Sequence, residues 1–474
     1  MSDRLNTDRL AVLAIILILL NIESCSKDKA AEPIDNIPPA AVTDLIAIDP
    51  TVNSVKLCWT APGDDANSGR ANKYDIRYST APIDNANWAS ALQVGAESTP
   101  LSAGDSEEFA IIGLSPGLSY YFALKTGDEV PNWSGLSNVA TTGTLPKWVA
   151  LGSGLTPWSV EAIAIYNEHL IAGGQFTNAG DVSANNIAAW DGISWSPLSS
   201  GIGNPRVTAL ASYAGLLMAG GDFTTAGGAT ANQIAKWDGI AWSGLIGNAY
   251  GSVYALAVYN TKLIAAGDFT WYYNPYNISD IARWNNPGWS GLGSTSGLVS
   301  ALTIYDGRLI AGGRFTNIGG VTASNIAAWD GNVWLPLGSG VDNDVLAMTV
   351  YKGRLIVGGR FTLAGGVGAN NIATWDKTAW SSLGAGTNKE IHALTVWDEN
   401  LIAGGDFTTA GGITANKIAA WNGSSWSPLG LGLSGGGTGA VVLALGIYNS
   451  QLIAGGVFAT AGGVPANNIA AWVK

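Results

Sequence analysis

The sequence predicts an all-β protein in which a β-sandwich precedes a seven-bladed β-propeller with four strands in each blade. Glycine occurs 63 times and tryptophan 20 times in 474 residues, whereas charged residues make up 12% of the chain. This composition favours strands joined by tight turns. Two further observations are a repeat of about 46 residues over the C-terminal two-thirds of the chain and alternating strand-like segments before it.

The first element, residues 1–24, is predicted to be a lipoprotein-type signal peptide. Its apolar run over 10–20 is too short to span a bilayer as a helix, which suits a secretory signal. The run ends in Ile-Glu-Ser-Cys, which resembles the lipobox of bacterial lipoproteins and implies lipidation of Cys25. Glu23 departs from the small residue usual at its position. An ordinary signal or an uncleaved anchor, with Cys25 incidental, is the alternative.

The lipobox resemblance implies a place for the protein in the cell. Residues 25–37 are polar and contain proline, so we expect a flexible tether. The chain would then lie outside the cytoplasm, held to a bacterial outer membrane or cell surface by its N-terminal lipid alone.

Residues 38–144 carry short alternating segments that predict a β-sandwich. Trp59, the Tyr74-x-Ile76-x-Tyr78 pattern and Leu114-x-Pro116-Gly117-x-x-Tyr120 resemble the fibronectin type III domain, in which the last pattern forms a tyrosine corner. The resemblance implies a spacer. The acidic loop Gly63-Asp64-Asp65 could hold a cation or form a solvated turn.

The repeats occupy residues 147–474, and three aromatic positions count them. A phenylalanine follows each Gly-rich strand, at Phe176, Phe223, Phe269, Phe315, Phe361, Phe407 and Phe458. Two tryptophans recur beside it, and each repeat offers four strand-like pieces, as a propeller blade does. The array starts with a lone fourth-strand segment at Trp148 and stops after a third strand at Trp472. The first segment is therefore predicted to complete the last blade.

The repeats resemble the kelch-like and galactose-oxidase-like β-propellers of extracellular proteins. That resemblance rests on the Gly-Gly-x-Phe and Trp-Asp-Gly positions and implies a fold, not a function. A tryptophan present in every blade is expected to pack between blades rather than to form a sugar platform.

Candidate ligand-contacting residues lie where the repeats diverge. The third repeat replaces a common Gly-rich loop with an aromatic connection, which could contact a ligand or fold over its own blade. The candidates are Trp271, Tyr272, Tyr273 and Tyr276, with Trp158 and Trp397 as secondary ones.

The residue before the recurring phenylalanine also varies. If these residues form a ring, one arc is acidic and the opposite arc is basic. Such a polarised face could orient a partner, or the side chains could simply be solvated. This charged arc comprises Asp222, Asp268, Arg314, Arg360 and Asp406.

The sequence holds no recognisable catalytic motif, and with two histidines and two cysteines no metal site or cofactor is expected. A net charge of −12 argues against nucleic acid as a partner. We therefore expect a monomeric, non-catalytic protein for binding, adhesion or scaffolding, with an unidentified protein or carbohydrate ligand. The alternative is a polysaccharide hydrolase or lyase whose carboxylates converge at the propeller axis.

Overall fold

The structure is a computed structural model, and it describes residues 35–95, 97–130, 132–245, 249–273, 276–437 and 439–474. The predicted signal peptide, Cys25 and most of the predicted tether lie outside these residues. The described part is all-β, as predicted, apart from one 3-10 turn, η1 (Trp88–Ser90). It contains no helix with the length and hydropathy of a membrane span.

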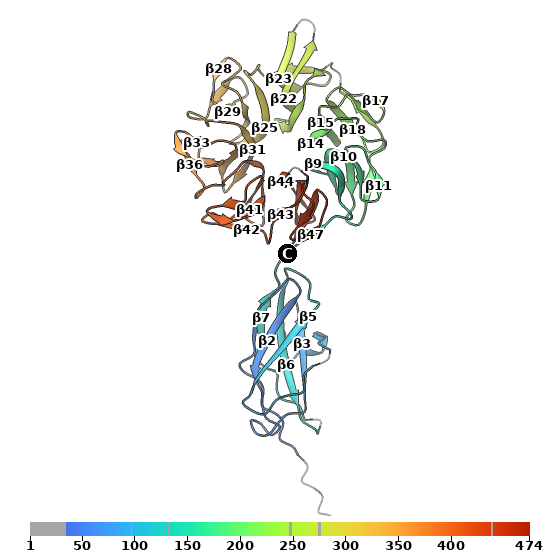
Figure 1. The fold of residues 1–474 in the computed structure, drawn as a ribbon, viewed down its shortest axis with the longest axis vertical. Helices are drawn as coiled ribbons and strands as arrows, with labels where there is room; N and C mark the ends of the chain where they lie inside the picture. The colour runs from blue at the N-terminus through green and yellow to red at the C-terminus, as the bar shows by residue number, and fades with distance from the viewer. Residues whose placement is uncertain (1–34, 96, 131, 246–248, 274–275, 438) are drawn as a thin grey trace, which may run out of the picture. The chain divides into compact units, whose positions relative to one another are not determined.

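Two sheets form the predicted β-sandwich in the N-terminal part (Figure 1). One sheet has the order β1 (Ile46–Ile48), β2 (Ser54–Thr60), β5 (Ser106–Ile112), and the other β4 (Leu92–Gln93), β3 (Lys73–Ser79), β6 (Ser119–Gly127), β7 (Ala140–Gly143). Trp59 of β2 meets Tyr74 of β3 edge to face, with ring centroids 5.1 Å apart. Aromatic packing of this kind contributes stability beyond that gained by burying both side chains.

The Tyr120 hydroxyl lies where a tyrosine corner requires it. It accepts a hydrogen bond from the Ser115 backbone N–H at 2.9 Å, five residues upstream. The side chain is buried, so its polar end meets a backbone partner while its ring joins the core.

The described residues divide into two compact units. The first contains 35–46, 58–109 and 122–140; the second contains 47–57, 110–121 and 141–474. The division crosses strands of the N-terminal sheets, and the predicted limits at 38, 144 and 147 stay predictions.

Seven antiparallel sheets, each with four main strands, follow one another around a ring, and those of blades one and three have a short fifth strand (Figure 1). The first three are β9 (Leu155–Tyr166), β10 (His169–Ala179), β12 (Ile187–Trp190), β13 (Trp195–Pro197); β14 (Val207–Tyr213), β15 (Leu216–Gly221), β18 (Ile234–Trp237), β19 (Trp242–Gly244); and β21 (Val253–Tyr259), β22 (Lys262–Tyr273), β23 (Tyr276–Trp284), β24 (Trp289–Gly291). The next three are β25 (Leu298–Tyr305), β26 (Arg308–Arg314), β29 (Ile326–Trp329), β30 (Trp334–Pro336); β31 (Val345–Tyr351), β32 (Arg354–Gly359), β35 (Ile372–Trp375), β36 (Trp380–Ser382); and β37 (Ile391–Trp397), β38 (Asn400–Gly405), β41 (Ile418–Trp421), β42 (Trp426–Pro428).

The seventh blade confirms the predicted closure. Its sheet has the order β44 (Val441–Tyr448), β45 (Gln451–Val457), β48 (Ile469–Val473), β8 (Lys147–Ala150). Trp472 of β48 lies opposite Trp148 of β8 in the antiparallel register. Pairing the two ends of the array removes two exposed sheet edges, which would otherwise template aggregation.

Between the second and third strands most blades carry a small hairpin. These hairpins are β16 (Thr225–Ala226) with β17 (Ala229–Thr230), β27 (Asn317–Ile318) with β28 (Val321–Thr322), β33 (Leu363–Ala364) with β34 (Val367–Gly368), and β39 (Thr409–Ala410) with β40 (Ile413–Thr414). Blade one has β11 (Val182–Ser183) on β10, and blade seven has β43 (Leu433–Ser434), β46 (Thr460–Ala461) and β47 (Val464–Pro465). In blade three, where β20 (Ala249–Tyr250) joins β22, the strands β22 and β23 extend into one long hairpin.

The recurring tryptophans pack between and within blades. In each blade the third-strand and fourth-strand tryptophans lie opposite one another, with ring centroids 5.2–5.4 Å apart. The fourth-strand indole also donates to a leucine carbonyl at the outer edge of the preceding blade. The described bonds are Trp148 to Leu429, Trp195 to Leu151, Trp242 to Leu198, Trp334 to Leu292, Trp380 to Leu337 and Trp426 to Leu383.

Glycine in the second strand lets neighbouring blades approach closely. A Cβ on Gly173 would lie 2.6 Å from Cγ1 of Val207 in the next blade, and one on Gly455 would lie equally close to Val160. Real Cβ atoms do not tolerate such contacts, so these positions require glycine for the blades to pack. The Gly-rich strand and the large tryptophans are therefore parts of one packing arrangement.

Candidate functional site

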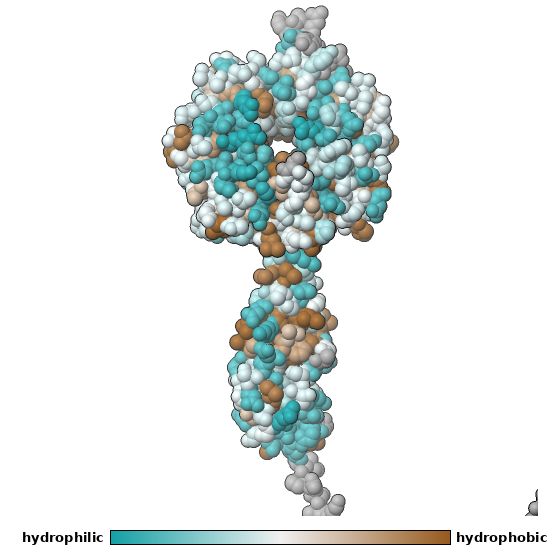
Figure 2. Space-filling view, in the orientation of Figure 1, coloured by the Kyte–Doolittle hydropathy of each residue, from teal (hydrophilic) through white to brown (hydrophobic). Residues whose placement is uncertain are grey.

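One face of the propeller, called the ring face below, is where each blade's first strand begins and its second strand ends. Charged residues at these two positions come close together, although they lie far apart in sequence. Figure 2 shows an opening at the centre of the ring with hydrophilic residues on both sides of it. The ring face carries the ion pairs and the hollow described below and is our candidate site.

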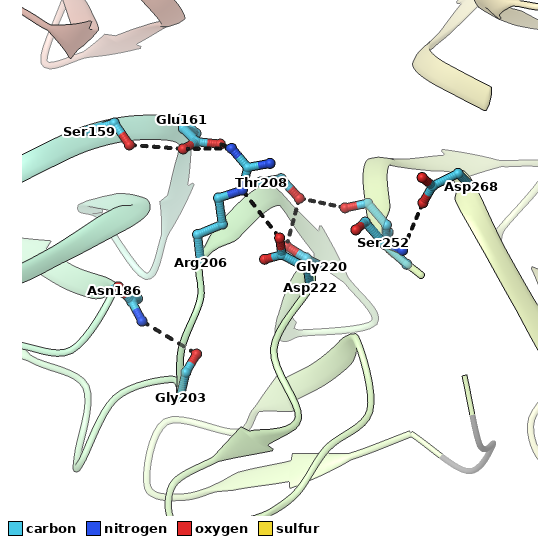
Figure 3. Close-up of polar contacts among 11 residues, drawn as sticks. Ser159, Glu161, Asn186, Gly203, Arg206, Thr208, Gly220, Asp222, Ser252 and Asp268 are labelled. Carbon is cyan, nitrogen blue, oxygen red and sulfur yellow. Dashed lines mark hydrogen bonds and ion pairs between the residues drawn. The ribbon is translucent and has the colours of Figure 1, made fainter. Parts of the chain in front are cut away.

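Arg206 links blades one and two on the ring face (Figure 3). Its Nη1 lies 3.1 Å from Oε2 of Glu161 on β9, and its Nε lies 3.4 Å from Oδ2 of Asp222, which follows β15. The Ser159 hydroxyl donates to Oε1 of Glu161 at 2.8 Å. Asp222 of the predicted arc therefore has a cationic partner.

Asp344 joins the two arginines of the predicted arc. Arg314 holds it in a bidentate pair, with Nε to Oδ1 at 2.8 Å and Nη2 to Oδ2 at 2.6 Å, and Nη1 of Arg360 lies 3.7 Å from Oδ2. Arg360 also pairs with Glu390 at 3.2 Å. Hydrogen bonds from Arg314 hold the pKa of Asp344 below its ordinary value, because they favour the charged carboxylate.

Asp406 is paired with two lysines. Nζ of Lys389 lies 3.1 Å from Oδ2, and Nζ of Lys417 lies 3.0 Å from Oδ1. Burial opposes ionisation, but hydrogen bonds from Lys417 and then Lys389 lower the pKa of Asp406 overall. Its charge, like that of Asp344, is matched locally.

The predicted polarised arc therefore needs a correction. Asp222, Arg314, Arg360 and Asp406 lie on one face, as expected, but each forms an ion pair with a neighbouring side chain and they do not make opposed acidic and basic fields. The sequence interpretation missed the partners Glu161, Arg206, Asp344, Lys389, Glu390 and Lys417. Aligning the repeats at the residue before each first strand would have found Arg206, Asp344 and Glu390.

Asp268, the fifth residue of the arc, differs from the other four. Its Oδ1 accepts a hydrogen bond from the Ser252 N–H at 2.9 Å (Figure 3), and no ion pair of the described residues includes it. It lines a hollow of about 600 Å³ between blades three and four. The hollow is also lined by Asp280, Ser296, Arg314, Phe315 and Thr316.

Asp280 occupies a position that is asparagine in four other blades. There the amide donates to a carbonyl of the chain entering the next blade, as Asn325 does to Val341 at 2.8 Å and Asn468 to Leu155 at 2.7 Å. Asp280 instead accepts from the Thr295 N–H at 3.0 Å. Burial raises the pKa of Asp280, and the charge of Asp268 adds to that rise.

The predicted aromatic surface of blade three is corrected in part. Trp271 is 2% exposed, stacks on Phe269 at 4.1 Å and contacts Trp289 at 4.5 Å, so it belongs to the core and cannot contact a ligand. The backbone pairs Tyr272 with Asn277 and Tyr273 with Tyr276. The side chains of these three tyrosines lie outside the described residues.

The two secondary tryptophans have different surroundings. Trp397 is half-buried, and its indole donates to the Ser450 carbonyl of the next blade at 2.8 Å. It replaces the tyrosine that ends other first strands, such as Tyr351, whose hydroxyl donates to the Glu399 backbone carbonyl at 3.2 Å. Trp158 is 53% exposed, at an irregularity of β9 on the ring face, and remains a candidate.

Both histidines of the sequence lie in the propeller. No three His, Cys, Asp or Glu side chains there already converge as metal ligands. His392 lies beside Glu390 on the ring face, and burial lowers its pKa. His169 is exposed, and its Nδ1 lies 2.7 Å from the Asn167 carbonyl in a turn.

Comparison with known proteins agrees with the propeller fold. A family described as "Domain of unknown function (DUF5122) beta-propeller" matches residues 306–327, in blade four. Calcium-activated chloride channel regulator 1 of Mus musculus is 39% identical over 118 residues, which are 23% of this chain and 13% of that protein. Its Homo sapiens counterpart is 35% identical over 112 residues, 22% and 12% of the two chains.

A further relative is Endoglucanase B of Cellulomonas fimi, 26% identical over 117 residues, which are 25% of this chain and 10% of that enzyme. This chain thus spans only about an eighth of the first relatives. Among solved structures, titin domains A168-A170 match with 22% identity and a TM-score of 0.18, over 23% of this chain and 32% of that one.

Proposed function

We propose that this protein is a non-catalytic binding protein whose propeller takes a neutral, hydroxyl-rich ligand, a glycan chain, on the ring face. The observation that carries the proposal is the hollow between blades three and four. There Asp268 has no cationic partner among the residues that the structure describes, whereas the other charges of the arc are paired. A carboxylate without an ion-pair partner can accept hydrogen bonds from ligand hydroxyls in addition to the one from the Ser252 N–H, and Arg314, Ser296 and Thr316 line the same hollow.

Charge matching favours a neutral ligand over a charged protein surface. Arg206, Arg314 and Arg360 all contact carboxylates, so little net field remains to steer a charged partner to this face. Trp158, exposed in blade one, offers the kind of aromatic surface on which a sugar ring packs. A protein ligand is the competing outcome of the test below.

Hydrolysis of a polysaccharide is the second candidate function, and Asp280 favours it. A carboxyl group with a raised pKa beside a second carboxylate is the pair that glycoside hydrolysis uses. Against it, Asp280 stands at the structural asparagine position and its oxygen is engaged by Thr295. We therefore favour binding.

A glycan array combined with assays of reducing-sugar release tests both functions. We expect bound glycans without turnover, and weakened binding in the Asp268→Asn variant. Glu168→Gln, which changes an exposed turn carboxylate at the other end of the first-strand hairpin, is the matched control. Turnover of any glycan that Asp280→Asn abolishes would establish the hydrolase instead. Binding to proteins but to no glycan would contradict our choice of ligand.

We infer further that the chain acts outside the cytoplasm as a lipid-anchored monomer, with a fibronectin type III spacer and a kelch-like propeller. The Ser115 contact of Tyr120 supports the spacer assignment, and the lipobox-like sequence supports the anchor. The Cys25→Ala variant should lose its association with membranes. Continued membrane association of that variant would count against lipidation.

A further inference from the structure

A second acidic region lies in the first unit, where three segments meet. The Ala66 N–H donates to the Pro38 carbonyl at 3.2 Å, which joins the loop after β2 to the start of the described chain. The Asn132 side chain donates to the Asp35 carbonyl at 3.2 Å, which joins the segment after β6 to the same place. These contacts bring together five acidic side chains, called the sandwich cluster below: Asp35, Asp64, Asp65, Asp128 and Glu129.

The sandwich cluster has no cationic partner among the described residues. Its carboxyl groups lie near one another instead, and the negative charges of neighbouring acidic residues act on both Asp64 and Asp65. Partial burial raises the pKa of Asp64, and Glu129, Asp128 and Asp65 add to the rise. Like charges at such close range repel unless a proton or a cation is shared between them.

The burial of Asp128 is a second observation, independent of the pKa shifts, that indicates a ligand in the sandwich cluster. It is 1% exposed, and its Oδ1 accepts a hydrogen bond from the Asn132 N–H at 3.0 Å. Its Oδ2 is buried and has no hydrogen-bond partner, and the same is true of Oδ1 of Asp64. Leaving a buried acceptor unsatisfied costs about 1–3 kcal/mol, and more when the group is charged. Each of these two acceptor oxygens therefore calls for a partner.

We propose that the sandwich cluster binds a calcium ion through the carboxylates of Asp64, Asp128 and Glu129, with Asp35 and Asp65 at its rim. The cluster offers oxygen ligands and no nitrogen or sulfur, the donor set of a hard cation. Calcium tolerates irregular coordination by six to eight oxygens, whereas magnesium demands a near-ideal octahedron. No three acidic side chains of the described residues converge on one point, so calcium binding would require the exposed Glu129 side chain to turn toward Asp64 and Asp128.

The ion would act as a clamp on the sandwich. It would tie together the start of the described chain, the loop after β2 and the segment after β6, which are joined by hydrogen bonds such as Ala66 N–H to Pro38 and Asn132 Nδ2 to Asp35. Calcium modules outside cells bind with Kd values of about 0.1–1 mM. Binding to the folded form alone stabilises it by mass action, so the clamp would close where calcium is abundant.

Isothermal titration calorimetry with calcium chloride, on the full chain freed of metal, tests this site. We expect one ion bound, and at least about a tenfold loss of affinity in the Asp128→Asn and Glu129→Gln variants. Glu129 is exposed, so its substitution cannot act by unfolding the chain. Glu108→Gln, which neutralises an exposed carboxylate on β5, should bind as the wild type does.

Two outcomes would overturn the proposal. One is the absence of calcium binding by the folded wild-type chain at millimolar concentration. The other is unchanged affinity in the Glu129→Gln and Asp64→Asn variants. A proton on Asp64 would then be the partner, and it would be recognised by stabilisation at mildly acidic pH with no response to calcium.

Discussion

The ring face and the sandwich cluster both bring carboxylates close together, but they resolve the repulsion in opposite ways. On the ring face Asp344 and Asp406 have arginine or lysine partners, and their pKa values are lowered. In the sandwich cluster Asp64 and Asp65 have none, and their pKa values are raised. The comparison teaches that a cluster of acids indicates a ligand only where the chain itself supplies no counter-charge.

The largest expected change in stability comes from removing a tryptophan that packs between blades, because this packing positions the charged residues of the ring face. Trp334 is 2% exposed and bonds to the preceding blade, so Trp334→Ala should reduce the free energy of unfolding by about 3–5 kcal/mol. Trp158→Ala, at an exposed site, should change it by less than about 0.5 kcal/mol. Denaturant melts of the two variants make the measurement. Equal effects would show that the recurring tryptophans are not packing residues.

The next effect compares the two acidic regions directly, in calcium-free buffer. Asp344→Asn removes the charge that Arg314 and Arg360 share, and should destabilise the propeller by about 1–3 kcal/mol, the lower end being favoured because Arg314 is exposed. Glu129→Gln removes a repulsive charge from the sandwich cluster and should stabilise the sandwich. Limited proteolysis reads out each region separately. The same direction of change in both would break the comparison.

A smaller expected effect is the change of folding stability with pH, which has opposite signs on the ring face and in the sandwich cluster. The lowered pKa values of Asp344 and Asp406 give stability above the ordinary carboxyl range near 4, which is lost as the pH falls through the folded-state values. Burial lowers the pKa of His392, so the propeller also loses stability as the pH falls below about 6.5.

The sandwich cluster should respond in the other direction. Because the pKa values of Asp64 and Asp65 are raised, the folded state holds more protons there, and calcium-free stability falls as the pH rises from about 4 through the raised values. Hydrogen exchange at pH 3, pH 5 and pH 7, corrected for intrinsic rates, measures both regions. Parallel changes would contradict the assignment of matched and unmatched charges.

The sequence was sufficient for features that repeat and insufficient for contacts that join different blades or loops. Ring closure could be predicted because the fourth-strand segment at Trp148 had no blade and the last blade had no fourth strand. The pair of Arg314 with Asp344 was missed because it joins residues 30 apart on adjacent blades. Trp271 was wrongly predicted to be exposed because the sequence of an aromatic connection is the same whether its side chains enter the core or face the solvent. Asp128 was not linked to Asp64 because only the fold brings their loops together.

Hydrogen–deuterium exchange of the full chain, with and without millimolar calcium, tests the central claim most directly, because it reports on both regions in one sample. The account predicts slower exchange in peptides that contain Asp64 or Asp128 and unchanged exchange in those that contain Asp344 or Asp406. Unchanged exchange around Asp64 and Asp128, or equal protection on the ring face, would contradict it.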